Sequence, residues 1–303
     1  MSTMTFPLPF QKFLWKLLDL VKSLVNMGSI SHSDIYLLSR DAVETKRLNT
    51  QHRFLVAISG NNIIHPSIPN NINSIADLGT GTGVWLEDVS KVLPNKSADL
   101  HGFDISSAQY PPDHQIRRPG QKSIPLSVHD VLRPFPKEHH SRYDLVHIRL
   151  LTAGLKKRRL RDWPNGYVQW EEVDHTAFCT DAVPEAAVVT QLRQSVINAM
   201  LTLGLWPFAP KRVHEEISAG GFCDIVHETY TTTGKEHLRG VAQKWVDGVM
   251  RALVPPSMVV TGEAKSEAGA REMVEGLVAE FNEHCDHARA MVNFGVVVGR
   301  KAD

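Results

Sequence analysis

The sequence has few of the features that mark secreted, membrane-spanning or polyanion-binding proteins. Its 303 residues include only three cysteines, Cys179, Cys223 and Cys285, and no CxxC pair. An odd number of widely spaced cysteines does not suit a disulfide framework, so we expect reduced thiols. Lys plus Arg equal Asp plus Glu at 33 each, which leaves no net field to attract nucleic acid. The composition therefore favours a cytoplasmic protein without a nucleic-acid partner.

The sequence also lacks an uninterrupted apolar run long enough to cross a bilayer. The stretch from Phe10 to Val25 is apolar at helical spacing, but Lys16 and Asp19 interrupt it. We interpret it as a helix that packs on the protein, with peripheral membrane contact as the alternative and no stable membrane insertion. A second helical pattern runs from about Ser33 to Phe54. Residues 1–70 are therefore predicted to form an N-terminal helical cap.

After residue 70 the pattern changes to short apolar runs separated by polar or helical segments. This alternation is typical of an α/β protein with a mainly parallel sheet. The seven predicted strands are Ile72–Leu78, Asp99–Phe103, Ser127–His129, Tyr143–Ile148, Tyr167–Glu171, Cys223–Tyr230 and Asn293–Gly299.

Three helical patterns follow the fifth predicted strand. Pro184–Leu203 carries an apolar stripe, and two more helices, near Lys235–Leu253 and Ser266–His284, form an insertion at about 235–290 before the last strand. Pro255–Gly262 is predicted to be a connector inside this insertion. Residues 71–303 then form one Rossmann-like domain with a helical insertion.

The most informative motif is the glycine-rich segment Asp77-Leu-Gly-Thr-Gly-Thr-Gly83, which links an apolar strand to a helical pattern. Gly79, Gly81 and Gly83 allow positive φ angles and a close approach of the main chain to a ligand, and we expect the loop, with Thr80, to present backbone N–H groups to it. A dinucleotide fingerprint reads G-x-G-x-x-G, whereas here the third glycine comes one residue early.

The charge of Asp77 distinguishes between the two adenosine cofactors. A carboxylate just before the loop would repel a pyrophosphate, but it would suit a ligand that carries an ammonium and a sulfonium. The motif therefore favours S-adenosylmethionine over a nicotinamide dinucleotide.

Two further carboxylates end the next two predicted strands. Asp104 lies about twenty residues past the glycines, where a carboxylate accepts hydrogen bonds from a ribose diol. Asp130 could accept from the adenine amine, with Val131 in apolar contact with the ring. Each acidic residue alone could also be a turn former or a helix cap, but their order along the chain favours a cofactor site.

On these motifs the chain resembles the class I S-adenosylmethionine-dependent methyltransferases. Tyr143-Asp-Leu-Val-His-Ile-Arg149 and Gly166-Tyr-Val-Gln-Trp-Glu-Glu-Val-Asp174 further resemble a fungal group associated with specialised metabolism, which also includes a nuclear regulator of such pathways. The resemblance implies a seven-stranded sheet, an N-terminal segment that closes over the cofactor and a substrate pocket that includes the inserted helices. It also places Ile105 and Arg149 near the cofactor, and Tyr36 and Trp170 near the substrate.

One departure from the family is the link of about sixteen residues between Leu150 and Tyr167, where relatives carry a full crossover helix. A link of this length can still make a parallel connection, but it leaves part of the sheet uncovered. The same link holds the basic run Lys156–Arg161, interpreted as a solvated crossover or as a nuclear-import or anion-binding patch.

Methyl transfer requires alignment of nucleophile, methyl carbon and sulfur, and it needs a base only if the acceptor keeps its proton. His147 and Glu171 are the candidate catalytic residues, and the alternative for His147 is a core histidine. The sequence predicts a small-molecule methyltransferase of a fungal biosynthetic pathway. The competing hypothesis is a cofactor-binding regulator, which could be nuclear, or a catalytically impaired relative.

Overall fold

The computed structural model describes residues 42–131, 133–151 and 166–301. The described residues all belong to one unit of the chain, Leu38–Asp303. The predicted helix over Phe10–Val25, the start of the second helix with Tyr36, and most of the short link with its basic run lie outside the described residues. Among the described residues, no helix combines the length and apolarity needed to cross a bilayer.

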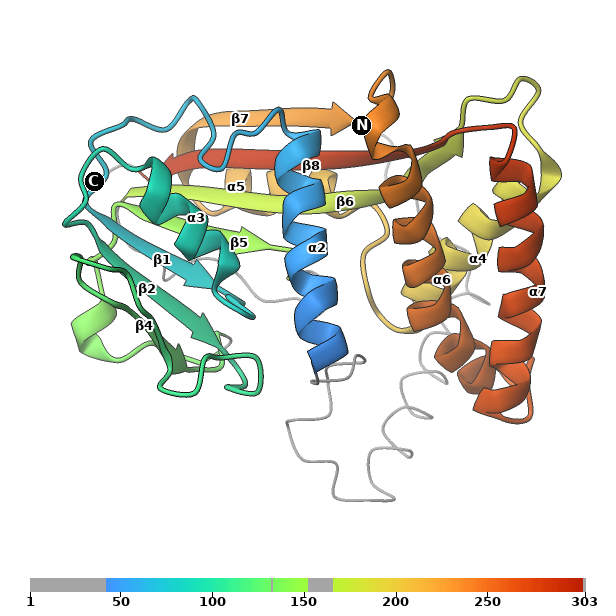
Figure 1. Ribbon diagram of the computed structural model, residues 1–303, viewed down its shortest axis with the longest axis horizontal. Coiled ribbons are helices and arrows are strands. Elements are labelled where there is room, and N and C mark those ends of the chain that lie inside the picture. Colours follow the sequence, from blue (N-terminus) through green and yellow to red (C-terminus); the bar gives the residue numbers. More distant parts are fainter. Residues whose placement is uncertain (1–41, 132, 152–165, 302–303) are drawn as a thin grey trace, which may run out of the picture. The chain divides into compact units, whose positions relative to one another are not determined.

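A mixed sheet forms the framework of the described unit (Figure 1). Its strand order is β3-β4-β2-β1-β5-β6-β8-β7, in which β6–β8 and β7–β8 are antiparallel and β4-β2-β1-β5-β6 are parallel. Apart from the two-residue β3, these are the seven strands predicted from the sequence, so the methyltransferase-type α/β fold is confirmed. The bounds are β1 Ser74–Leu78, β2 Asp99–Asp104, β3 Gln115–Ile116, β4 Ile124–Val128, β5 Leu145–Arg149, β6 Gly166–Thr180, β7 Phe222–Thr231 and β8 Ala290–Lys301.

The helices cover the two faces of the sheet unequally (Figure 1). Phe54 of α2 and Trp85 of α3 pack with Ile75 of β1 on one face, whereas Ile217 of α5 packs with Ala76 of β1 on the other. Alternation of side chains along β1 therefore separates two apolar clusters. The helices are α2 Ala42–Ile58, α3 Val84–Val92, α4 Ala187–Thr202, α5 Ala209–Ala219, α6 Arg239–Thr261 and α7 Glu267–Cys285, with two short 3₁₀ segments, η2 Lys137–His139 and η3 Glu236–Leu238.

The strand β6 is much longer than the sequence predicts. Its first part pairs with β5 as far as Glu171, and it then continues to Thr180 with β8 as its neighbour. The polar stretch after Glu171 hid this extension, because strand prediction relied on apolar runs. Together with α4, the extension forms the base on which the insertion, α6 and α7, is packed (Figure 1).

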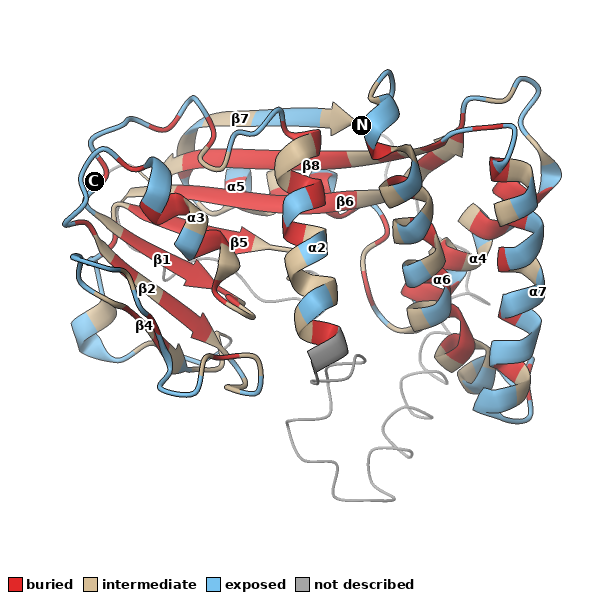
Figure 2. Ribbon diagram, in the orientation of Figure 1, coloured by how far each residue is buried: buried red, intermediate tan, exposed pale blue. Residues whose placement is uncertain are grey.

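The predicted connector Pro255–Gly262 is wrong for most of its length. Helix α6 runs through Pro255 and Pro256 to Thr261, and Gly262 ends it in the left-handed conformation. Burial of Val254, Pro255 and Ser257 in the packing of the insertion outweighs the loss of the proline N–H donors. Figure 2 shows the buried positions concentrated in the sheet and on the inner faces of the helices around it.

Candidate cofactor site

The glycine-rich loop turns the chain from β1 into α3. Gly79, Gly81 and Gly83 have φ angles of 72°, 54° and 77°, a region that side chains rarely adopt. A Cβ on Gly83 would also lie 2.6 Å from the Ile116 side chain. Glycine is therefore required at this turn by both conformation and space.

The amides of this loop bond inside the protein, contrary to the prediction that they face a ligand. The N–H groups of Gly79 and Thr80 donate to the Phe103 carbonyl at 2.8 and 3.0 Å, and that of Gly83 donates to the Thr80 carbonyl at 2.9 Å. The Gly81 N–H donates to Asp104 Oδ2 at 2.9 Å. The loop thus offers a backbone surface without bulky side chains, but its glycine donors are already used.

Asp104 ends β2 beside this loop, as predicted. In addition to the Gly81 bond, its Oδ1 accepts a longer bond of 3.3 Å from the Ser106 amide. Burial raises the pKa of this carboxyl, and the amide donors only partly offset the effect. The next residue, Ile105, keeps 42% of its surface exposed. A hydrogen-bonding carboxylate and an open apolar side chain are therefore adjacent at the end of β2.

Asp130 follows β4, the strand next to β2 in the sheet. The amide of His129 donates to the Asp104 carbonyl at 2.8 Å and holds the two strand ends together. Asp130 lies 3.6 Å from Arg133 in an ion pair, and Val131 packs, partly buried, against the apolar cluster on the α5 face. Asp77, Asp104 and Asp130 therefore stand at the carboxyl ends of three neighbouring strands.

Asp77 is turned into the protein. It is 3% exposed, its Oδ2 accepts a 2.7 Å bond from the Thr80 hydroxyl, and its Oδ1 lies 2.7 Å from His147 Nδ1. The sequence-based prediction placed this carboxylate near the cationic groups of the ligand and did not foresee its bonds to Thr80 and His147. In the structure Asp77 acts on the loop through Thr80.

His147 is buried between two carboxylates. Its side chain is 1% exposed, its Nε2 lies 3.6 Å from Glu171 Oε2, and its ring stacks on Trp85 at a centroid distance of 3.6 Å. Burial opposes the charge, but Glu171 and Asp77 outweigh it and raise the pKa of the imidazole. An imidazole that is 1% exposed and already faces two carboxylates offers no open nitrogen to a substrate, which favours the core-histidine alternative over the general-base role.

Glu171 belongs to the same buried network and is not open to a substrate. Its Oε1 accepts a 2.5 Å bond from Gln169, and Arg149 lies 3.8 Å from its Oε2. Burial disfavours the charged carboxylate, but the His147 charge outweighs it and lowers the pKa of Glu171. Its carboxylate is therefore already engaged with His147 and Arg149.

Trp170 is placed away from any open surface, contrary to its predicted contact with a substrate. It is 3% exposed, packs with Ile217 of α5, and donates from Nε1 to Glu172 Oε1 at 2.9 Å. The neighbouring Glu171 faces the opposite side of β6 because side chains alternate along a strand. Trp170 is a core residue of the α5 face.

The helix α2 lies against the glycine-rich loop, through residues that no sequence motif identified. Thr82 donates to Asn49 at 2.8 Å, and Thr45 donates to Gln109 at 2.5 Å. A Cβ on Gly81 would lie 3.5 Å from Leu48. Helix α2 therefore packs against the loop through Asn49 and Leu48.

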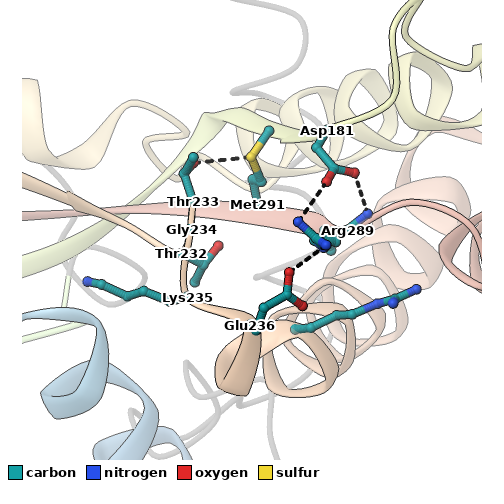
Figure 3. Close-up of a pocket in the computed structure, with 10 residues that line it drawn as sticks. Asp181, Thr232, Thr233, Gly234, Lys235, Glu236, Arg289 and Met291 are labelled. Atoms are coloured by element: carbon teal, nitrogen blue, oxygen red, sulfur yellow. Dashed lines mark hydrogen bonds and ion pairs between the residues drawn. The ribbon is translucent and has the colours of Figure 1, made fainter.

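Two pockets lie apart from the loop, both around the insertion. The first is formed by the turn Thr232–Glu236 with Asp181, Arg239 and Arg289–Met291. Figure 3 shows Arg289 between Asp181 and Glu236, which neutralise it at 3.6 and 2.6 Å. The second is apolar and is lined by Val173, His175, Phe178, Val196, Trp245, Val246, Val249 and Val292.

Comparison with known proteins relates the chain to fungal methyltransferases. It is 34% identical over 189 residues to the methyltransferase grgD of a Penicillium species, which covers 56% of this chain and 63% of that protein. It is 29% identical to the N-methyltransferase verN of Clonostachys rogersoniana, over 45% of this chain and 50% of that protein. The secondary metabolism regulator laeA of Aspergillus flavus is 23% identical over 79% of this chain and 70% of its own length.

The chain thus spans 63% and 50% of the length of the first two relatives. No family model matches it. Among solved structures, a Haemonchus contortus phosphoethanolamine N-methyltransferase 2 in complex with S-adenosyl-L-methionine aligns at a TM-score of 0.38 and 14% identity, over 84% of this chain and 57% of that one.

Proposed function

Because the chain is a homologue of the fungal class I methyltransferases of specialised metabolism, a group that includes laeA, we propose that it is an S-adenosylmethionine-dependent methyltransferase acting on a small molecule. The cytoplasm is its proposed location, with the nucleus as the alternative. The regulator alternative rests on the basic run Lys156–Arg161, which lies outside the described residues, and no described residue favours it.

The choice of cofactor rests on one observation: backbone N–H groups of the glycine-rich loop already donate hydrogen bonds within the protein. A dinucleotide places a pyrophosphate on free amides at such a turn. Here the amides of Gly79, Thr80, Gly81 and Gly83 all bond within the protein. S-adenosylmethionine has no phosphate, so it needs only a close approach to the main chain and acceptors for its hydroxyl and amine groups.

The residues around the loop fit such a ligand. Asp104 would accept from the ribose hydroxyls, Ile105 would contact the adenine with its exposed side chain, and Asp130 with Val131 would receive the adenine amine edge. Arg149, which is 14% exposed beside Glu171, offers a cation to the ligand carboxylate. When bound, the cofactor supplies an electrophilic methyl group on a sulfonium.

The protein's own contribution is then binding and alignment. The two candidate bases, His147 and Glu171, are enclosed and paired with each other, so neither removes a proton from an acceptor. An acceptor that attacks through an existing lone pair, such as an amine, needs no such base. Since verN is named an N-methyltransferase, we propose a nitrogen acceptor for this chain as well.

The test is calorimetric titration of the full chain with S-adenosylmethionine and S-adenosylhomocysteine. Asp104→Asn should raise the Kd about 10- to 100-fold, because one hydrogen bond from the ligand to a charged group is lost. Asparagine keeps an oxygen for the Gly81 amide, so the loop itself is preserved. Asp286→Asn, at the end of α7, is the matched control and should leave the Kd unchanged. Absence of binding by the unaltered protein would overturn the proposed function.

A further inference from the structure

A line of buried charged side chains crosses three strands beneath the glycine-rich loop. The strand register sets Asp77 of β1 beside His147 of β5, and Glu171 of β6 beside Arg149 of β5. The contacts run from Asp77 to His147 at 2.7 Å and from His147 to Glu171 at 3.6 Å. The second distance is too long for a hydrogen bond, so Glu171 acts on His147 as a charge.

The line ends at Thr80, in the middle of the loop. The Thr80 hydroxyl donates to Asp77 at 2.7 Å, and the side chain is 7% exposed. From the other side, a Cβ on Gly102 would come within 2.8 Å of the Thr80 hydroxyl, so β2 passes close against it. Thr80 is therefore fixed between Asp77 and the backbone of β2.

Stability alone does not account for this arrangement. Apolar side chains of similar volume commonly stabilise a core as well as a buried ion pair does, because the pair must be removed from water. An apolar core would, however, offer no acceptor for the Thr80 hydroxyl. The charged side chains instead hold the Asp77 carboxylate at one place and in one orientation under the loop.

Other groups around His147 strengthen this orientation. Trp85 of α3 stacks on the imidazole with only 2° between the ring planes, which fixes the ring rotation. Arg149 lies 3.8 Å from Glu171, and Gln169 donates to Glu171 at 2.5 Å. The ring of His147 and the carboxylate of Glu171 are thus both held by neighbours outside the line.

We propose that His147 is a positioning residue of the cofactor site: paired with Asp77 and Glu171, it holds the Asp77 carboxylate against Thr80 and so sets the conformation of the Gly79–Gly83 loop. The role acts through Asp77 and Thr80, and it involves no contact with the substrate. The expected effect of this role on cofactor binding depends on the proposed function. The loop conformation can be measured without any ligand.

The first experiment removes the hydrogen bond between the Thr80 hydroxyl and Asp77. Thr80→Val keeps the shape of the side chain and deletes the hydroxyl, and Thr80→Ser restores it. Thr190→Val is the matched control, because Thr190 is an exposed residue of α4 whose hydroxyl donates to Glu185 at 2.6 Å. Hydrogen exchange of the amides in residues 79–86 is measured in the cofactor-free protein, together with the Kd for S-adenosylhomocysteine.

We expect Thr80→Val to speed exchange in the loop and to raise the Kd, each about tenfold, the size that corresponds to one buried hydrogen bond. Thr80→Ser should return both values close to those of the unaltered protein. Exchange in α6 and α7 should not change. Loop exchange and Kd that match the control in a folded Thr80→Val protein would overturn the inference.

A second experiment addresses His147 and separates the inference from the proposed function. His147→Asn keeps an N–H donor near Asp77 but removes the positive charge, and Glu171→Gln removes its partner charge. Both should speed loop exchange while the exchange of α7 stays unchanged. If the unaltered protein binds no adenosyl ligand, the proposed function fails, but loop exchange in these variants still decides the inference. Uniform acceleration across the whole protein would show a merely structural role and would count against it.

Discussion

Two regions of the molecule shift the pKa of a histidine in opposite directions. In the cofactor corner, made of Asp77–Gly83, Asp104, His147 and Glu171, the carboxylates outweigh burial and raise the pKa of His147. In the insertion region, made of α6, α7, α4 and the β6 extension, His175 lines an apolar pocket, and burial lowers its pKa to about 4. The neighbours of His147 favour the charged imidazole, whereas those of His175 favour the neutral one.

The difference lies in the neighbours that each strand supplies. His147 has a carboxylate on the strand to each side, whereas the pocket around His175 is built from valine and aromatic side chains. Burial alone disfavours the charged form in both places. The cofactor corner is therefore organised by charge and the insertion region by apolar packing, and the two should respond differently to substitution and to pH.

The largest expected effect is the loss of the cation in the cofactor corner. His147→Leu leaves Asp77 and Glu171 buried without their partner, and it should lower the free energy of unfolding by about 3–5 kcal/mol. His175→Leu removes a neutral ring from apolar surroundings and should cost less than about 1.5 kcal/mol. Urea unfolding at neutral pH measures both. Equal losses in the two variants would break the comparison.

The next effect is a loss of stability on acidification. The folded-state pKa of His52, His101 and His175 is lowered to about 4 by burial, so between that value and 6.5 the unfolded chain binds more protons. Stability should fall as the pH falls, by about 2 kcal/mol for each of these histidines near pH 5. His147, whose pKa is raised, contributes in the opposite direction, and its stabilisation is lost as the pH rises through its folded-state pKa.

Variants assign this pH dependence to the two regions. Urea unfolding near pH 5 and pH 7.5 should show a shallower dependence for His175→Leu, because one proton-binding difference is removed. His147→Leu should show a steeper dependence, because its opposing contribution is gone. A parallel shift of both curves would mean that neither histidine has the protonation state described above.

The smallest expected effect concerns the cap of α7 in the insertion region. The Ser266 hydroxyl accepts the Gly269 amide at 3.2 Å, so Ser266→Ala should lower the free energy of unfolding by about 1 kcal/mol. Affinity for S-adenosylhomocysteine should stay as it is, since α7 contributes nothing to the cofactor corner. A changed affinity would show that the regions are coupled.

Much of the fold could be predicted from the sequence, because the apolar runs and the turn chemistry are local. The glycine-rich turn, all seven longer strands and both inserted helices follow from patterns within a few residues of each other. The predicted end of β6 at Glu171 was wrong because the extension to Thr180 is partly polar and is stabilised by β8, a strand more than a hundred residues later. The two prolines inside α6 were misread as a break for a similar reason, since tertiary packing holds them in the helix.

The cofactor site was only partly predictable, because its chemistry depends on which side chains face each other across strands. Asp77 and His147 are seventy residues apart, and only the register between β1 and β5 makes them neighbours. The same register places a carboxylate against the imidazole and so favours its charged form. The faces of β6 likewise decide that Glu171 joins this network and that Trp170 does not.

The extension of β6 has a consequence for how this protein could diversify. Beyond Glu171 the strands β6, β8 and β7 continue as an antiparallel ribbon, and α6 and α7 are a single excursion between β7 and β8, rooted in that ribbon. Lengthening, shortening or exchanging the excursion would leave the parallel strands and their carboxyl edge untouched. Evolution, or a chimera built between paralogues, can therefore change α6 and α7 while the residues around the glycine-rich turn stay the same.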